Sequence, residues 1–128
     1  MTQDLTMLIW TVALTFVQML IAAAGANSQV GLVTLAGNRD AMPAVTGWPG
    51  RAARAHANML ENLPLFIALV LAAQVTNHAN ATTALGAQLF FWARLLYAIV
   101  YVAGIPWVRT LVWLVSIIGL LMIFVQLV

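Results

Sequence analysis

The chain has 128 residues, of which 64% are hydrophobic and only 6% are charged, and its mean hydropathy is +1.01. A soluble domain is usually about 45–50% apolar and about 25% charged. The composition therefore excludes a disordered chain, a collagen-like repeat and an ordinary water-soluble fold, and it indicates a membrane protein. The formal charge of +2 comes from so few basic residues that they cannot form the clustered surface that binds nucleic acid.

Cysteine is absent, which excludes disulfides, thiolate metal sites and a cysteine nucleophile. The two histidines, His56 and His78, fall near opposite ends of a predicted membrane helix. We therefore expect no metal site that uses both of them.

Four segments are long and apolar enough to cross a bilayer, whose core of about 30 Å needs about 20 residues of helix. The predicted helices cover roughly residues 5–24, 55–73, 83–103 and 107–128. The first segment has Asp4 and no basic residue before it, and it is longer than the apolar part of a signal peptide, so we expect a retained helix. The predicted fold is an all-α membrane protein with a single four-helix transmembrane domain over residues 1–128.

The connections between these helices predict the orientation in the membrane. Residues 25–50 are expected to form a long polar loop, residues 75–82 an uncharged loop, and residues 104–106 a short turn. The first loop is flanked by Arg39, Arg51 and Arg54 and the third by Arg109, whereas the opposite face has no Lys or Arg. The positive-inside rule then places the arginine-bearing face in the cytoplasm and both termini on the non-cytoplasmic side.

Two of the predicted helices carry polar side chains at helical spacing within apolar sequence. One face of the second helix carries Arg51, Arg54, Asn58 and Glu61. One face of the third helix carries Phe90, Arg94, Tyr97 and Tyr101. Ionisable side chains within a membrane span cost about 2.5–3.5 kcal/mol each and usually find a partner in the bundle interior. We expect the two faces to meet, with an ion pair between Glu61 and Arg94 within or between subunits.

Arg109 is predicted to lie in the first turn of the fourth helix, which begins near Pro106 because proline suits the first helical position. The unpaired amides and the positive dipole end of a helix favour an anion there. An arginine at this place is unfavourable for the helix but suited to holding a thiolate, a carboxylate or a phosphate. Pro64 predicts a kink in the second helix, either to open space for a ligand or to curve the helix.

Each of these residues also has a plainer interpretation. Arg51 and Arg54 could extend to lipid headgroups, and a Glu61–Arg94 pair could be purely structural. The two tyrosines could be packing residues, and His56 fits a residue at the membrane boundary better than a catalytic base.

The residues 50–66, GRAARAHANMLENLPLF, resemble a signature of the MAPEG family, the membrane-associated proteins in eicosanoid and glutathione metabolism. The residues 93–101, ARLLYAIVY, followed by Pro106 and Arg109, are similar to a second signature of this family. The residues 37–40, GNRD, are similar to the first loop of its bacterial branch. The resemblance covers nearly the whole chain and implies a multi-pass protein of the bacterial inner membrane.

The resemblance also implies a homotrimer in contact with membrane lipids, in which glutathione is the co-substrate and binds in a cleft between neighbouring subunits on the cytoplasmic side. One subunit would contribute Arg54, Asn58 and Glu61, with Arg51 near the mouth of the cleft. The adjacent subunit would contribute Arg94, Tyr97 and Tyr101. Arg109 would be the catalytic residue, stabilising the glutathione thiolate, because a nearby guanidinium lowers the pKa of a thiol.

The expected function is a glutathione transferase or peroxidase that acts on a hydrophobic small-molecule substrate from the bilayer. The alternative is a non-catalytic lipid-binding or accessory protein, as one member of the family binds lipid without catalysis. Two departures favour the alternative, because many active members have a basic residue where Ala57 stands, and residues 26–29 are uncharged. A small proton-coupled exporter is a third possibility, but such a protein carries its carboxylate in the first helix.

Overall fold

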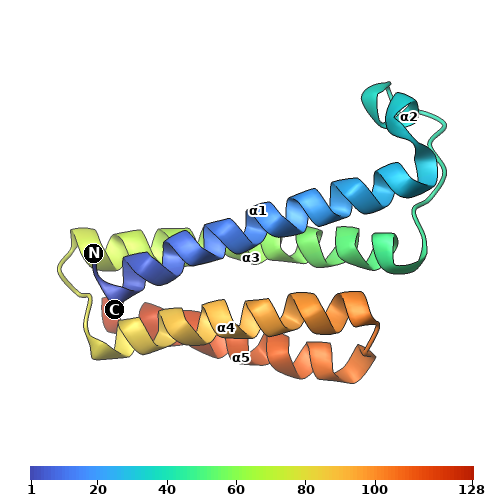
Figure 1. Cartoon of the computed structure of the whole chain (residues 1–128). Coiled ribbons are helices and arrows are strands. Elements are labelled where there is room, and N and C mark those ends of the chain that lie inside the picture. Colours follow the sequence, from blue (N-terminus) through green and yellow to red (C-terminus); the bar gives the residue numbers. More distant parts are fainter.

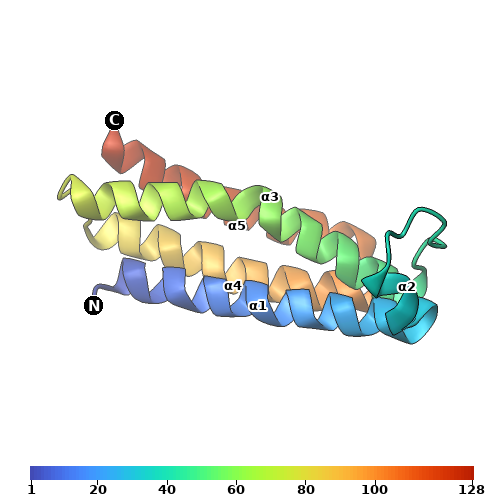
Figure 2. The same ribbon diagram turned by 90° about the horizontal axis from the view of Figure 1, so that it is seen from above.

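The computed structural model describes residues 1–128 as a bundle of helices without strands (Figure 1). The four long helices are α1 (Gln3–Val30), α3 (Gly47–Val75), α4 (Ala81–Ala103) and α5 (Pro106–Leu127), and the short α2 (Leu32–Ala36) lies between α1 and α3. Each long helix has the length and the apolar composition to cross a membrane, which confirms the prediction of a multi-pass, four-helix protein. Both termini lie at one end of the bundle, and the α1–α3 and α4–α5 connections lie at the other (Figures 1 and 2).

The predicted polar loop over residues 25–50 is wrong at both of its ends. α1 continues through Gly25 to Val30, because this glycine serves a close helix contact and not a turn: a Cβ there would lie 2.9 Å from the Cβ of Pro49. α3 begins at Gly47, so Trp48, Pro49 and Gly50 form its first turn. Proline is tolerated there because the first amides of a helix have no partner within it.

The shorter connection that remains is tied to both long helices by the side chain of Gln29. Its Nε2 donates to the carbonyl of Thr46 at 2.6 Å, and its Oε1 accepts from the amide of Thr46 at 2.9 Å. This pair of bonds joins the end of α1 to the residue before α3. The arginine-bearing end of the bundle is therefore held at a defined place although residues 37–46 contain no helix.

The boundaries of α4 and α5 agree with the prediction to within two residues, and the local sequence explains them. Asn80 caps α4 by accepting from the amide of Thr83 at 3.0 Å, while the Thr83 hydroxyl bonds back to Asn80. Gly104 ends α4 in the left-handed conformation, with φ of +85°, and Pro106 begins α5. The turn between α4 and α5 therefore places Arg109 in the first turn of α5, as predicted.

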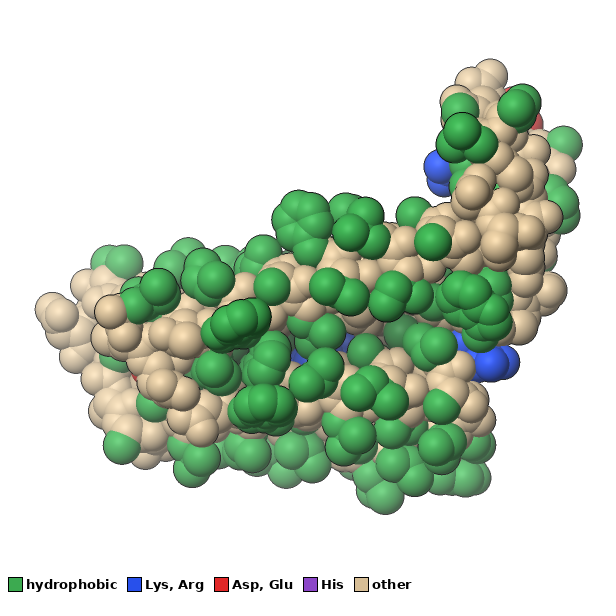
Figure 3. Space-filling model, in the orientation of Figure 1, with side chains coloured by type: hydrophobic (Ala, Val, Ile, Leu, Met, Phe, Trp, Pro, Cys, Tyr) green, Lys and Arg blue, Asp and Glu red, His purple; other side chains and the backbone are tan.

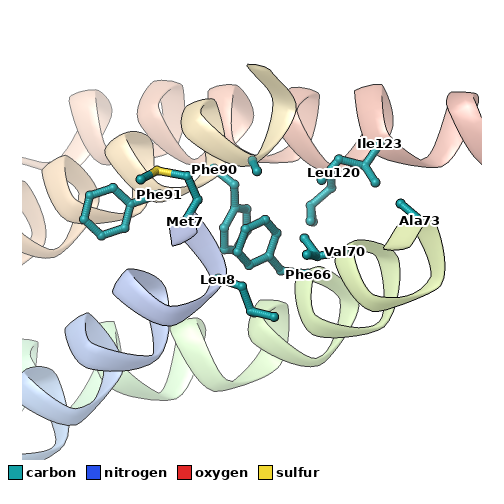
Figure 4. Packing of buried hydrophobic residues seen from close by; sticks show 10 residues of the cluster. Met7, Leu8, Phe66, Val70, Ala73, Phe90, Phe91, Leu120 and Ile123 are labelled. Atoms are coloured by element: carbon teal, nitrogen blue, oxygen red, sulfur yellow. The ribbon is translucent and has the colours of Figure 1, made fainter. Parts of the chain in front are cut away.

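The apolar core lies toward the end of the bundle that holds the termini. The rings of Phe66 and Phe90 stack with their centroids 4.2 Å apart, and aliphatic side chains such as Val70 and Ile123 surround them (Figure 4). α4 and α5 meet at Gly86 and Gly119, where a Cβ on either residue would lie 2.6 Å from the carbonyl oxygen of the other. Small residues allow such close helix packing in membranes.

Candidate functional site

The polar faces of α3 and α4 meet within one chain, as the spacing of their polar residues predicts. Arg94 is fully buried, and its Nη1 donates to Oδ1 of Asn58 on α3 at 2.8 Å. The Nε and Nη2 of Arg94 have no hydrogen-bond partner in the chain. The result is a buried cation that has one neutral hydrogen-bond partner and two nitrogens without a partner.

Two tyrosines connect this buried arginine to Arg109. The guanidinium carbon of Arg94 lies 4.2 Å from the centre of the Tyr97 ring. Tyr97 packs edge-to-face against Tyr101, one turn further along α4, with ring centres 5.5 Å apart. The guanidinium carbon of Arg109 lies 4.5 Å from the centre of the Tyr101 ring. Cation–π contacts of this kind fix the guanidinium planes without using their N–H donors.

Tyr97 and Arg109 border a small cavity of about 190 Å³ at the start of α5. It is lined by Asn58, Tyr97, Arg109, Thr110 and Trp113. Thr110 and Trp113 are absent from the predicted site. The spacing of Arg109 and Trp113, four residues apart in a helix, was a usable signal for the latter. The volume of this cavity is below the usual range of about 300–1,000 Å³ for small-molecule sites.

Asn62 is another residue that the sequence reasoning missed. It is buried on α3, and its Nδ2 donates to the backbone carbonyl of Asn58 at 2.8 Å and to the Asn58 Oδ1 at 3.2 Å. The Asn58 oxygen therefore accepts from both Asn62 and Arg94. This arrangement orients the amide of Asn58, and it makes Asn62 a positioning residue for the Arg94 contact.

The ion pair predicted between Glu61 and Arg94 does not form within the chain. Arg94 is bonded to Asn58 instead, and Glu61 is exposed on the outer face of α3. Arg54 is also exposed, and its Nη1 lies near Gly50, one turn earlier on α3. The polar residues of α3 are three and four residues apart, whereas a helix has about 3.6 residues per turn. Their side chains therefore point in somewhat different directions, and not all of them face α4. Glu61 and Arg54 thus have no partner across the α3–α4 contact.

Within one chain Asn58 and Arg94 are bonded to each other. The implication of the resemblance that Asn58 and the residues of α4 line the glutathione cleft from different subunits stays a prediction. Arg51 does not line the cavity that Arg109 borders. Its Nε donates to the carbonyl of Val102 at 2.9 Å, near the end of α4. The structure therefore brings together Asn58, Arg94, Tyr97, Tyr101 and Arg109, and it leaves Arg51, Arg54 and Glu61 outside this cluster.

The fold and the cluster define a class of protein: a four-helix membrane protein with tyrosines and arginines gathered at one end of the bundle. The model of the MAPEG family matches residues 6–128, which is nearly the whole chain. The chain belongs to the MAPEG family, and the resemblance seen in its signatures is confirmed. No curated protein and no solved structure gives a significant match.

Proposed function

We propose that the chain is a glutathione transferase or peroxidase of the bacterial inner membrane, acting on lipophilic electrophiles. The observation that carries the proposal is the cavity at the start of α5, which Arg109 lines together with Asn58 and Tyr97. Arg109 is half-buried there and is held against Tyr101. Its charge is therefore fixed beside the unpaired amides of the first turn of α5, where an anion is favoured.

Glutathione carries two carboxylates, an ammonium and a thiol. Arg109 lines the cavity and would hold the thiolate, while Arg54 and Glu61, which lie outside the cluster of their own chain, would meet a carboxylate and the ammonium from a neighbouring copy. The two nitrogens of Arg94 that have no partner in the chain are compatible with an anionic ligand nearby. The family of the chain supports this choice of ligand over other small anions.

The proposed chemistry needs a thiolate at Arg109. The thiol loses its proton to solvent, and the guanidinium of Arg109 stabilises the sulfur anion that remains. In the transferase reaction the thiolate attacks an electrophilic carbon, a C–S bond forms, and the leaving group departs with its electron pair or, in an opened epoxide, stays attached as an alkoxide that takes a proton. The electrophile reaches the sulfur from the bilayer, where apolar compounds concentrate.

A single chain does not complete the site, and we propose that a homotrimer does. Glu61 lies at the midpoint of α3, within a membrane-spanning helix, yet it is exposed in the single chain. An exposed carboxylate at that depth faces lipid at a cost of several kcal/mol unless another chain covers it. A neighbouring copy would cover this face of α3 and enlarge the 190 Å³ cavity to a size that suits a tripeptide.

Titration calorimetry of glutathione into the detergent-purified protein, in buffers of different ionisation enthalpy, tests this function. We expect binding with release of a proton, and loss of the proton release in Arg109→Ala. Turnover of a lipophilic electrophile should fall by about 100-fold or more in Arg109→Ala. The matched control is Arg39→Ala, because Arg39 lies in the exposed connection at the same end of the bundle, does not line the cavity, and donates its Nε–H to the Leu35 carbonyl. Unchanged turnover in Arg109→Ala would contradict the catalytic role.

One observation favours the second candidate, a non-catalytic lipid-binding or accessory protein. Arg94 and Asn58 are bonded to each other and so are partly withdrawn from any ligand. In that case the polar cluster only stabilises the bundle. Absence of glutathione binding in the calorimetric experiment would support this function, and efficient conjugation of glutathione would exclude it.

A further inference from the structure

A second, larger cavity lies on the other side of the α3–α4 contact, between α1, α3 and α4. Its volume is about 440 Å³, within the range of small-molecule sites, and ten of its eleven lining residues are hydrophobic. It follows the furrow between α1 and α4 in Figure 3, at whose right-hand end arginine atoms are visible. Ala55 borders this cavity and also packs with Tyr97, so it belongs to the wall between the cavity and the cluster around Arg109.

Small side chains create this cavity. α3 contributes Ala52 and Ala55 to its wall, and α4 contributes Ala98, and all three are buried. An alanine side chain ends at Cβ, so these helices cannot fill the space beneath α1. The cavity therefore results from small buried side chains on regular helices, and it is not a gap at a disordered surface.

Gln18 is the polar residue of the cavity, and it lacks a partner. Its side chain is only 7% exposed, and its Oε1 has no hydrogen-bond partner in the chain. A half-turn of the terminal amide exchanges its oxygen and nitrogen, so the group can meet either a donor or an acceptor. An amide in such surroundings needs a hydrogen bond from an occupant of the cavity, because no other group of the bundle supplies it.

Arg51 lies at the end of the cavity nearest the α4–α5 turn. Its Nε donates to the carbonyl of Val102, which borders the cavity, and the side chain rests against Gly104, where a Cβ would lie 3.4 Å from the Nε. A guanidinium has five N–H donors, and this bond uses one of them. Arg51 can therefore bind an anionic group while it remains fixed to α4.

The depth of Gln18 below Arg51 follows from the packing of α1 on α3. Gly25 contacts Pro49, so Arg51 lies near the level of Ala23 on the antiparallel α1. Gln18 precedes Ala23 by five residues on α1. At the rise per residue of an α-helix, Gln18 therefore lies about 8 Å deeper than Arg51 along the bundle. An occupant thus meets a cation first, an amide about one and a half helical turns deeper, and only apolar side chains beyond.

We propose that this cavity binds one acyl chain of an anionic phospholipid, with the phosphate on Arg51 and an ester carbonyl on the amide of Gln18. A glycerophospholipid has its groups in this order: a phosphate, ester carbonyls and then hydrocarbon. The same end of the bundle carries Arg39, Arg54 and Arg109 against the single acid Asp40, so its charge favours an anionic lipid. This cavity shares no lining residue with the cavity beside Arg109, and the proposal does not rest on the proposed glutathione function.

Native mass spectrometry of delipidated protein with dioctanoyl phosphatidylglycerol tests the proposal, with dioctanoyl phosphatidylcholine and glycerol 3-phosphate as comparison probes. We expect about one retained phosphatidylglycerol per chain, a preference of about fivefold over phosphatidylcholine, and no binding of the chain-free headgroup. Arg51→Gln should remove the preference. Equal binding of the two lipids by the unaltered protein would overturn the proposal.

Filling the cavity provides the second arm. Ala98→Leu should weaken phosphatidylglycerol binding by about tenfold or more, whereas the control Ala53→Leu, on the exposed face of α3, should change it by less than about twofold. Gln18→Leu keeps the size of the side chain and should fold even if Ala98→Leu does not, and we expect weaker binding. Equal binding by Gln18→Leu and the unaltered protein would contradict the site.

A single cysteine distinguishes a lipid from a second copy of the chain as the occupant. The chain has no cysteine, so Ala98→Cys carries the one thiol. We expect N-ethylmaleimide to label this thiol in delipidated protein and phosphatidylglycerol to slow the labelling. Cross-linking of this cysteine to a neighbouring chain, or an unreactive thiol in delipidated protein, would show that another copy fills the cavity and would overturn the proposal.

Discussion

Arg94 on α4 is fully buried and donates one hydrogen bond, of 2.8 Å, to the amide oxygen of Asn58 on α3, while its Nε and Nη2 have no partner in the chain. A buried cation without a carboxylate is costly in any protein, and more so within a membrane span. Tyr97 contributes its ring face on one side, which lowers this cost without a second charge. The polar contact between α3 and α4 therefore depends heavily on Asn58.

Asn58→Leu should destabilise the bundle because it leaves Arg94 without its hydrogen-bonded partner. Hydrogen bonds to charged groups contribute about 1.5–3 kcal/mol, so we expect a loss of about that size in the free energy of unfolding. Thermal unfolding in detergent, followed by circular dichroism, measures it. The double variant Asn58→Leu/Arg94→Met should recover part of the loss, since it removes the buried charge as well. A double variant less stable than Asn58→Leu would contradict this account.

Gly86→Ala should weaken the contact between α4 and α5. The added Cβ would lie 2.6 Å from the carbonyl oxygen of Gly119, and two helix backbones cannot both shift without cost. We expect about 1–3 kcal/mol of destabilisation, measured as a lower midpoint of thermal unfolding. Gly37→Ala is the control, because Gly37 has a negative φ and the nearest atom to the new Cβ would be the Val33 carbonyl oxygen at 3.4 Å. Equal midpoints for both variants would show that the helices separate more easily than their packing indicates.

The sequence was sufficient to predict the number, order and approximate limits of the long helices, because length and hydropathy determine membrane spans almost alone. The error over residues 25–50 has a specific cause. The prediction assigned Gly25 and Pro49 to a loop, but these residues permit a close contact between α1 and α3. A sequence alone does not distinguish a glycine that allows close packing from a glycine that allows a turn.

The candidate site could be predicted in its parts but not in its pairing. Helical spacing placed Asn58 and Arg94 on facing stripes, and both lie at the α3–α4 contact. Spacing does not say which member of one stripe meets which member of the other, so Glu61 was assigned to Arg94 in place of Asn58. The rotation of α3 about its own axis decides between them, and α3 packs mainly against α1 and α4.

Tyr101 should act on the proposed reaction through the position of Arg109. Tyr101→Phe keeps the ring face on which the Arg109 guanidinium lies, so turnover should stay within about twofold of the unaltered protein if that face is its main role. Tyr101→Ala removes the face, and we expect kcat to fall by about 10- to 100-fold as Arg109 becomes misplaced. Steady-state kinetics with glutathione measures both variants. A loss in Tyr101→Phe as large as in Tyr101→Ala would assign the role to the hydroxyl and not to the ring.

The orientation in the membrane is testable with single cysteines, since the chain has none. Asn38→Cys lies in the exposed connection between α1 and α3, and Asn77→Cys lies in the exposed turn between α3 and α4, at the opposite end of the bundle. All arginines near the helix ends gather at the first of these two ends, so the positive-inside rule predicts that this end is cytoplasmic. In intact bacterial cells an impermeant maleimide, admitted through a permeabilised outer membrane, should label Asn77→Cys and not Asn38→Cys. The reverse labelling would place Arg109 and the proposed glutathione site on the outer side, where the cytoplasmic pool of glutathione is out of reach.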